Sequence, residues 1–226
     1  MKAIILAAGR GERLRPLTDT CPKPLLHVRG KRLIEWHLEA LARAGVHDVV
    51  VNTAWLEEQF PAALGDGSRY GLRLRFSMEG RDHGGALDTA GGIVKALPLL
   101  GDLFWVVSGD VFLPDFDFAR ADGDAFATSA NLGLLWLVPP APHHPDGDFG
   151  IDAHGSASRS VRPRLKWASV GLFRAGLFKG MTPGVAVPLA APLDVAAAAG
   201  RLAGKRWDGT CIDVGTIDRL NSLNQV

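Results

Sequence analysis

This 226-residue sequence has few cysteines, no long apolar run and no marked excess of either charge. Cys21 and Cys211 are the only cysteines, too few for a disulfide framework or a cysteine-rich zinc cluster, and they favour a reducing cytoplasm. No apolar run approaches the roughly 18–20 residues of a membrane span, and the apolar start at residues 1–6 is too short for a secretory signal. Lys and Arg number 25 against 24 Asp and Glu, which leaves no general basic field for nucleic acid.

Glycine, by contrast, is abundant. There are 27 glycines among 226 residues, against a usual content of roughly 7 %, and they follow no collagen-like period. Such an excess indicates either many turns or places where the backbone approaches a ligand closely.

Short apolar runs alternate with helical stretches, which predicts an α/β fold with a mixed, mostly parallel sheet flanked by helices. We expect one Rossmann-like domain over residues 1–226, with residues 72–78 near the sheet edge. Residues 139–163, rich in Pro, Gly, Asp, Ser and His, are expected to form a mobile insertion over a site. Strands are predicted at residues 2–7, 46–52, 72–78, 104–108, 132–138, 166–173, 205–207 and 210–214, and helices at 33–44, 55–64, 89–100, 193–203 and 216–224.

The loop after the first strand predicts a cradle for a polyphosphate. Gly9 and Gly11 follow a buried strand, where glycine lets backbone N–H groups turn toward an anion. Arg13, Arg15 and Lys23 add charges that suit phosphate oxygens. The loop lacks the Gly-Lys-Ser/Thr of a Walker A motif and the third glycine of the dinucleotide fingerprint. A tight structural turn is the alternative interpretation of the two glycines taken alone.

Two aspartates lie at the ends of short apolar runs. Asp110 follows the predicted strand at 104–108, at the carboxyl edge where α/β sheets bind ligands, and Asp213 ends residues 210–213. Mg²⁺ prefers one or two carboxylates together with substrate phosphates and water, so the pair is a candidate magnesium site. The alternative is that each aspartate caps a strand or helix, since Asp213 lies three residues before Thr216.

Residues 6–18, LAAGRGERLRPLT, followed by PKPL at residues 22–25, resemble the signature of the sugar-1-phosphate nucleotidylyltransferases. The resemblance runs over essentially the whole chain. Residues 54–56, 64–72 and 87–93, and His143-His144 with residues 147–149, are most similar to the members that use N-acetylmuramic acid 1-phosphate in bacterial cell-wall recycling.

This resemblance implies a GT-A-like domain that converts UTP and N-acetylmuramic acid α-1-phosphate to UDP-N-acetylmuramic acid and pyrophosphate. It implies Mg²⁺ on Asp110 and Asp213, and small-molecule substrates as partners, with neither nucleic acid nor a membrane. Arg13 and Lys23 are expected to be catalytic. The expected nucleotide-binding residues are Ala7, Ala8, Gly9, Gly11, Arg13, Lys23, Leu87 and Thr89. Gly150 matches a sugar-binding position by resemblance, and Asn52 and Glu79, each at a strand end, are the further candidates for the sugar.

The sequence departs from the family at three places. Residues 81–85 form a longer spacer on the base side, and no Glu-Lys-Pro segment supplies a lysine for the sugar phosphate, so that Arg162, Arg164 or Lys166 is a candidate replacement. Ser169 stands where a glycine is expected after the aromatic Trp167. His143 and His144 are interpreted as a loop feature, because adjacent histidines in a proline-rich loop rarely converge on one ion.

Two other functions remain open at this stage. The first keeps the chemistry and changes the substrates, to dTTP, GTP or CTP with glucose, mannose, heptose or phosphocholine acceptors. The second is a nucleotide-sugar-binding subunit without turnover, against which the retention of Lys23, Asp110 and Asp213 argues.

Overall fold

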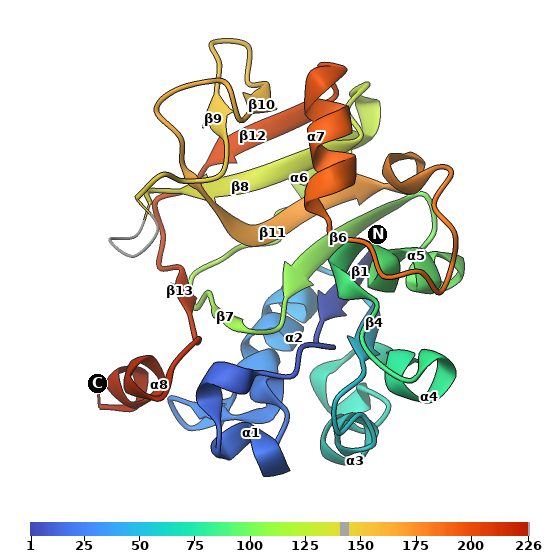
Figure 1. Ribbon diagram of the computed structural model, residues 1–226, viewed down its shortest axis with the longest axis vertical. Helices are drawn as coiled ribbons and strands as arrows, with labels where there is room; N and C mark the ends of the chain where they lie inside the picture. Colours follow the sequence, from blue (N-terminus) through green and yellow to red (C-terminus); the bar gives the residue numbers. More distant parts are fainter. Residues whose placement is uncertain (141–144, 226) are drawn as a thin grey trace.

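The computed structural model describes residues 1–140 and 145–225, so that His143 and His144 lie outside the described residues. Its centre is a seven-stranded mixed sheet (Figure 1) in the order β12-β8-β11-β6-β1-β4-β5. Neighbouring strands are parallel except at β11, which is antiparallel to both β6 and β8. Along the chain the strands are β1 (Lys2–Leu6), β4 (Asp48–Thr53), β5 (Arg73–Met78), β6 (Leu103–Ser108), β8 (Gly133–Val138), β11 (Lys166–Arg174) and β12 (Leu202–Arg206).

Helices cover both faces of this sheet because its strands are apolar on both sides, as parallel strands usually are. Alternate residues of β1 belong to opposite cores. Ile5 shares a cluster with residues of α2 (Leu33–Arg43), α3 (Gln59–Leu64) and α6 (Arg120–Thr128), and Ile4 shares one with residues of α5 (Asp88–Leu100) and α7 (Ala190–Ala198). A smaller third cluster attaches the C-terminal helix α8 (Ile217–Asn224) through Leu220 and Leu223.

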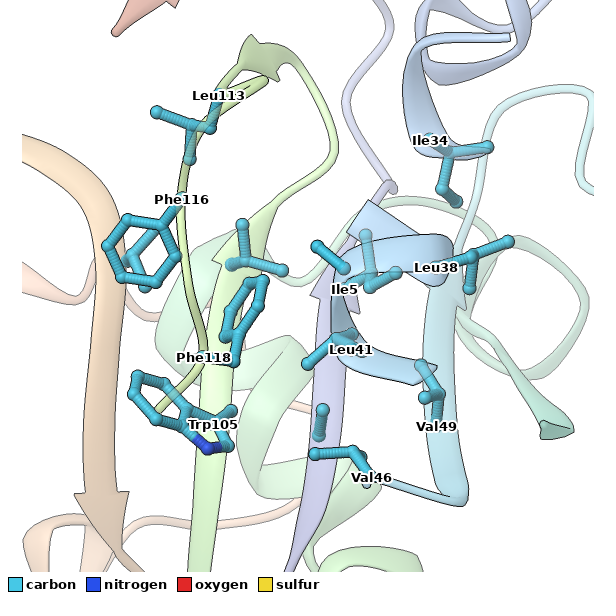
Figure 2. Close-up of a cluster of buried hydrophobic side chains, with 14 of the residues drawn as sticks. Ile5, Ile34, Leu38, Leu41, Val46, Val49, Trp105, Leu113, Phe116 and Phe118 are labelled. Carbon is cyan, nitrogen blue, oxygen red and sulfur yellow. The ribbon is translucent and has the colours of Figure 1, made fainter. Parts of the chain in front are cut away.

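The larger core is shown in Figure 2. Leu38 and Leu41 of α2 lie over Ile5 and Val49 of the sheet. Beside them the Trp105 ring meets that of Phe118 edge-on, with ring centroids 5.1 Å apart. This packing fixes α2 on β1 and thereby supports the loop that leaves the end of β1.

Shorter elements complete the fold. The loop after β1 holds 3₁₀ turns at Glu12–Leu14 and Lys23–Leu25 and the single-turn helix α1 (Leu17–Thr20). Further 3₁₀ turns occupy Ser68–Tyr70 and Ala175–Phe178. The remaining elements are β2 (His27–Val28), β3 (Lys31–Arg32), α4 (Glu79–His83), β7 (Val111–Phe112), β9 (Gly150–Ile151), β10 (Ala157–Ser158) and β13 (Ile212–Asp213).

The predicted α/β class with a mixed, mostly parallel sheet is confirmed, and β5 is the edge strand as expected. The predicted helix at 193–203 is wrong at its C-terminal end: α7 stops at Ala198, Gly200 adopts a left-handed φ of +66°, and the chain continues as β12. Within the predicted insertion at 139–163, β9 and β10 form a two-stranded ribbon. Among the residues described, no helix is both long and apolar enough to cross a membrane.

The order of the strands creates a natural binding edge between β1 and β6. From β1 the chain moves outward to β4 and β5, then returns through α5 to β6 on the other side of β1. The connections that leave the carboxyl ends of β1 and β6 therefore diverge, which opens a crevice at the switch point of an α/β sheet.

Candidate active site

A cavity of about 590 Å³ lies at this switch point, within the size range of small-molecule sites. Its wall is formed by the loop after β1, the segment 84–87 with the start of α5, and the ends of β4 and β6. The loop after β1 is called the phosphate loop and residues 84–87 the base-side loop, after the contacts that the sequence led us to expect. The lining residues are Leu6, Ala7, Ala8, Gly9, Gly11, Glu12, Arg13, Leu14, Lys23, Pro24, Asn52, Ala86, Asp88, Thr89, Ser108, Asp110 and Gly215.

Most of the residues that the sequence suggested for phosphate meet in this cavity. Gly11 has a φ of +70°, which favours glycine. A Cβ there would also lie 3.0 Å from the Thr18 methyl, which leaves little space for a larger residue. Arg13 extends toward the C-terminal segment, where its Nη2 lies 3.3 Å from the Cβ position of Gly215. Arg15 instead forms an exposed ion pair with Asp19 and does not line the cavity. The cradle therefore presents Arg13 and Lys23, but not Arg15.

Each of the two aspartates is in contact with a lysine. Lys23 Nζ lies 2.9 Å from Asp110 Oδ2, and Lys166 Nζ lies 2.6 Å from Asp213 Oδ2. The pairing of β7 with β13 brings the aspartates to adjacent positions: Asp213 is in register with Val111, and Val214 N donates to the Asp110 carbonyl. Two segments about 100 residues apart in the chain thus bring two carboxylates to adjacent positions, and each carboxylate contacts a lysine from a further segment, the loop after β1 or strand β11.

The donor set at this place fits a divalent cation. Both carboxylates already hold a positive group, the lysine ammonium, in direct contact. Within residues 1–140 and 145–225 no group of three or more His, Cys, Asp or Glu side chains could hold a metal. Two carboxylates from the protein, with the other ligands from phosphate and water, is the arrangement that Mg²⁺ favours.

Asn52 and Glu79 form a buried hydrogen-bonded pair. Asn52 Nδ2 donates to Glu79 Oε1 at 2.6 Å, and Asn52 Oδ1 accepts from Ala7 N at 2.8 Å. The second oxygen of Glu79 accepts from Leu87 N at 2.7 Å. Burial raises the pKa of the Glu79 carboxyl, although these two donors oppose the shift. Asn52 lines the cavity and Glu79 does not, so the two residues have different relations to a ligand there.

Ala86 of the base-side loop and Asp88 and Thr89 at the start of α5 line the cavity, whereas Leu87 is buried. The first amides of α5 are already used, because Ala90 N and Gly91 N both donate to the Val187 carbonyl. A ligand at this wall would therefore meet the Thr89 hydroxyl and the backbone of the loop rather than a free helix N-terminus.

The sugar-side candidates are spread more widely. A Cβ at Gly150 would lie 2.4 Å from the Val161 carbonyl oxygen, so this glycine permits close packing inside the insertion. Arg162 and Arg164 line a second cavity of about 530 Å³, together with Arg206. Of the three candidate replacements for the missing lysine, only Lys166 contacts one of the two aspartates.

Several residues of the cavity wall were not identified from the sequence: Ala86, Asp88, Ser108 and Gly215. Ser108 lies two residues before Asp110, and Gly215 lies two residues after Asp213. Their proximity to the aspartates in the sequence was the signal that could have identified them. Asp88 has a left-handed φ of +57°, a conformation that its residue type permits more readily than most, and nothing in the sequence marks it.

Comparison with known proteins agrees with this geometry. The family model described as "Nucleotidyl transferase" matches residues 2–162. The N-acetylmuramate alpha-1-phosphate uridylyltransferase of Neisseria meningitidis is 48% identical over 228 residues, which cover 97% of this chain and 95% of that protein. A glucose-1-phosphate thymidylyltransferase of Actinoplanes sp. is 34% identical over 184 residues, covering 76% of this chain and 57% of its own length.

One solved structure has the same fold at low sequence identity. A Bacillus anthracis protein described as a glucose-1-phosphate thymidylyltransferase, crystallised with sucrose, superposes with a TM-score of 0.84 at 20% identity, over 100% of this chain and 94% of that one. Since the family model covers residues 2–162 and the Neisseria relative is similar along nearly all of both chains, this chain belongs to the nucleotidyl transferase family.

Proposed function

We propose that this enzyme transfers the uridylyl group of UTP to N-acetylmuramic acid α-1-phosphate, releasing pyrophosphate and forming UDP-N-acetylmuramic acid. The observation that carries the proposal is the 48% identity to the Neisseria uridylyltransferase along 97% of this chain and 95% of that one. The cavity supports it, since its wall includes the cationic groups of Arg13 and Lys23, which suit phosphate, and the polar side chains of Asp88 and Thr89, which suit a base. We further propose that the reaction belongs to the recycling of cell-wall sugars in the cytoplasm.

The chemistry requires little from the protein beyond position and charge. The attacking oxygen belongs to a sugar phosphate that is already anionic at neutral pH, so no general base is needed, and in-line attack on the α-phosphorus expels pyrophosphate. Arg13 and Lys23 bind the triphosphate and stabilise the charge that develops on the leaving group. Asp110 and Asp213 would hold Mg²⁺, which supplies charge stabilisation at the α-phosphate when bound.

Both lysines would then change partners when the substrates bind. Lys23 lies 2.9 Å from Asp110, and the triphosphate oxygens are its alternative partner in this proposal. Lys166, 2.6 Å from Asp213, is the candidate in this chain for contact with the acceptor phosphate. In this proposal the carboxylates exchange an ammonium for the divalent cation, so that charge balance at the site is kept throughout.

A panel of nucleoside triphosphates and sugar 1-phosphates, assayed by pyrophosphate release with Mg²⁺, tests the proposed function. We expect UTP with N-acetylmuramic acid α-1-phosphate to give the highest kcat/KM, and Asp110→Asn to lower kcat by about a hundredfold or more. Near wild-type turnover of Asp110→Asn would contradict the mechanism.

A second substrate pair is favoured by one specific observation, the 34% identity to a glucose-1-phosphate thymidylyltransferase over 76% of this chain. Preference for dTTP and glucose 1-phosphate in the same panel would support it instead. Binding of UDP-sugars without pyrophosphate release for any pair would point to a non-catalytic subunit.

A further inference from the structure

A buried carboxylate, Glu79, connects two loops that both contribute to the wall of the cavity. Its side chain is 0% exposed, and its two oxygens have different partners. Oε2 accepts from Leu87 N in the base-side loop, and Oε1 accepts from Asn52 Nδ2. Asn52 in turn accepts from Ala7 N at the start of the phosphate loop. Three hydrogen bonds thus run without a break from one loop to the other.

Helix α5 leaves space for these hydrogen-bonded side chains. A Cβ on Gly92 would lie 2.5 Å from both Asn52 Nδ2 and Glu79 Oε1, so that only glycine in α5 leaves room for the pair. The Glu79 carboxylate sets the orientation of the Asn52 amide, because its oxygen requires the Nδ2 donor. Ala7 N is shared between Asn52 Oδ1 at 2.8 Å and the Asn52 backbone carbonyl at 3.1 Å. With both oxygens occupied and no exposed surface, Glu79 has no group left to offer a sugar.

We infer that Glu79 is a positioning residue for the nucleotide, which holds the base-side loop at a fixed distance from the phosphate loop through Asn52, and that it is not a ligand of the sugar. This inference rests on the proposed function and concerns the triphosphate end of the same site. It replaces the expectation, drawn from their strand-end positions, that Asn52 and Glu79 reach the sugar.

Glu79→Gln tests the inference because it removes one acceptor and keeps the shape. Asn52 Nδ2 and Leu87 N are both donors, and an amide offers them only one oxygen, so one buried donor is left without an acceptor. We expect the KM for UTP to rise about tenfold. The ratio of kcat/KM for UTP to kcat/KM for CTP should fall. The KM for N-acetylmuramic acid α-1-phosphate should stay within about twofold, since no sugar contact is lost.

Glu57→Gln is the matched control. Glu57 is also buried and also accepts two backbone N–H groups, from Gly80 and Arg81 at the start of α4, but it does not line the cavity. We expect this variant to lower thermal stability as Glu79→Gln does, while both KM values and the UTP:CTP preference remain those of the wild type. The control separates a general loss of stability from a loss of nucleotide positioning.

A second variant keeps the test decisive if Glu79→Gln folds poorly. Asn52→Asp alone places two acceptors face to face, whereas Asn52→Asp combined with Glu79→Gln restores all three hydrogen bonds with the middle one reversed, because the introduced amide donates to the introduced carboxylate. Glu79→Gln should therefore raise the KM for UTP in the wild-type background and lower it in the Asn52→Asp background, as a double-mutant cycle detects.

Three results would overturn the inference: a KM increase for the sugar phosphate alone, unchanged KM values for both substrates, or the same effect of Glu79→Gln in both backgrounds. The proposed function fails separately. If wild-type enzyme gives no UTP-dependent pyrophosphate release, the function is wrong whatever the variants do, and calorimetric titration with UTP then compares the same variants for positioning of the nucleotide.

Discussion

Four residues other than glycine have a left-handed backbone among those described: Arg29, Leu56, Asp88 and Ser169. For L-residues with a Cβ this conformation costs roughly 1–2 kcal/mol. Asp88 lies in the cavity wall, and Ser169, with a φ of +61°, lies in a bulge of β11 where the register with β8 shifts between Trp167 and Gly171. Ser169 is the position at which the family pattern led us to expect glycine.

We therefore predict that Ser169→Gly stabilises the protein. Glycine adopts a φ of +61° without steric cost, although it also gains entropy in the unfolded chain, so the net gain is about 1 kcal/mol. For a chain of this size that corresponds to a Tm increase of roughly 2–4 °C in a thermal melt. Ser169→Ala is the control, because alanine keeps the Cβ and should give no increase. An equal rise in Tm for both variants would show that the φ angle is not the cause.

Many of the residues that line the cavity could be predicted from sequence, but their partners could not. Gly9, Gly11, Arg13 and Lys23 follow one strand, and local sequence alone indicated an anion cradle that the cavity at this loop matches. The contact of Lys166 with Asp213 joins residues 47 positions apart and depends on how β11 and β13 meet. The roles of these residues in catalysis and binding stay predictions until the variants are assayed.

At the scale of elements, α5 shows how a helix is adapted to its neighbours. Its two consecutive glycines serve close packing: a Cβ on Gly91 would lie 2.4 Å from the Val185 carbonyl oxygen, and one on Gly92 would collide with the Asn52–Glu79 pair. In the segment 185–187, the Val187 carbonyl accepts from Ala90 N and Gly91 N of α5, and Val187 N donates to the Leu87 carbonyl. The two glycines let β4, α4 and this segment approach the helix closely.

Gly92→Ala should therefore damage the site as well as the fold. The added methyl displaces the Asn52 amide and the Glu79 carboxylate, and we expect a destabilisation of about 1–3 kcal/mol, measured by urea unfolding, with a higher KM for UTP. Gly85→Ala provides the comparison, because nothing lies within 4 Å of a Cβ there. Equal stability of Gly92→Ala and wild type would mean that α5 can shift away from the pair.

Elements with strong apolar periodicity were predicted well, and weak ones were not. Residues 2–7, 33–44 and 104–108 carry clear strand or helix patterns and form β1, α2 and β6. Helix α6 was not predicted, because its sequence RADGDAFAT buries only Gly123 and Phe126 and resembles a polar loop. The alanine-rich stretch before β12 gave no signal for where α7 ends, since alanine favours a helix throughout and only Gly200 interrupts it.

At the scale of the whole molecule, segments that are far apart in the chain meet near the β1–β6 switch point. Strand β7 follows β6, β13 comes from near the C-terminus, and their pairing places the two aspartates at adjacent positions. Helix α2 contacts β7 through His37, whose Nε2 donates to the Val111 carbonyl at 2.9 Å. His37 is 1% exposed, so its protonation state is linked to the stability of the entire fold.

Stability should consequently fall in mild acid because of His37. Burial lowers the pKa of His37 from 6.5 to about 4, although the Val111 hydrogen bond and the charge of Asp110 act in the opposite direction. Above pH 6.5 the histidine is neutral in both the folded and unfolded states. Between pH 6.5 and 4 the unfolded chain binds a proton that the folded protein does not, so the free energy of unfolding decreases by about 1.4 kcal/mol per pH unit, or about 3 kcal/mol in all.

Urea unfolding at several pH values between 7.5 and 4 measures this slope, and His37→Gln isolates it. The glutamine amide can still donate to the Val111 carbonyl but does not titrate, so the variant should lose stability less steeply than the wild type across the same interval. Carboxylates titrate near the acid end in both proteins, and the difference between the two curves removes their contribution. If the free energies of unfolding of the two proteins fall in parallel with pH, His37 does not cause the loss of stability. If they converge as the pH falls, the burial of neutral His37 at the contact between α2 and β7 causes it.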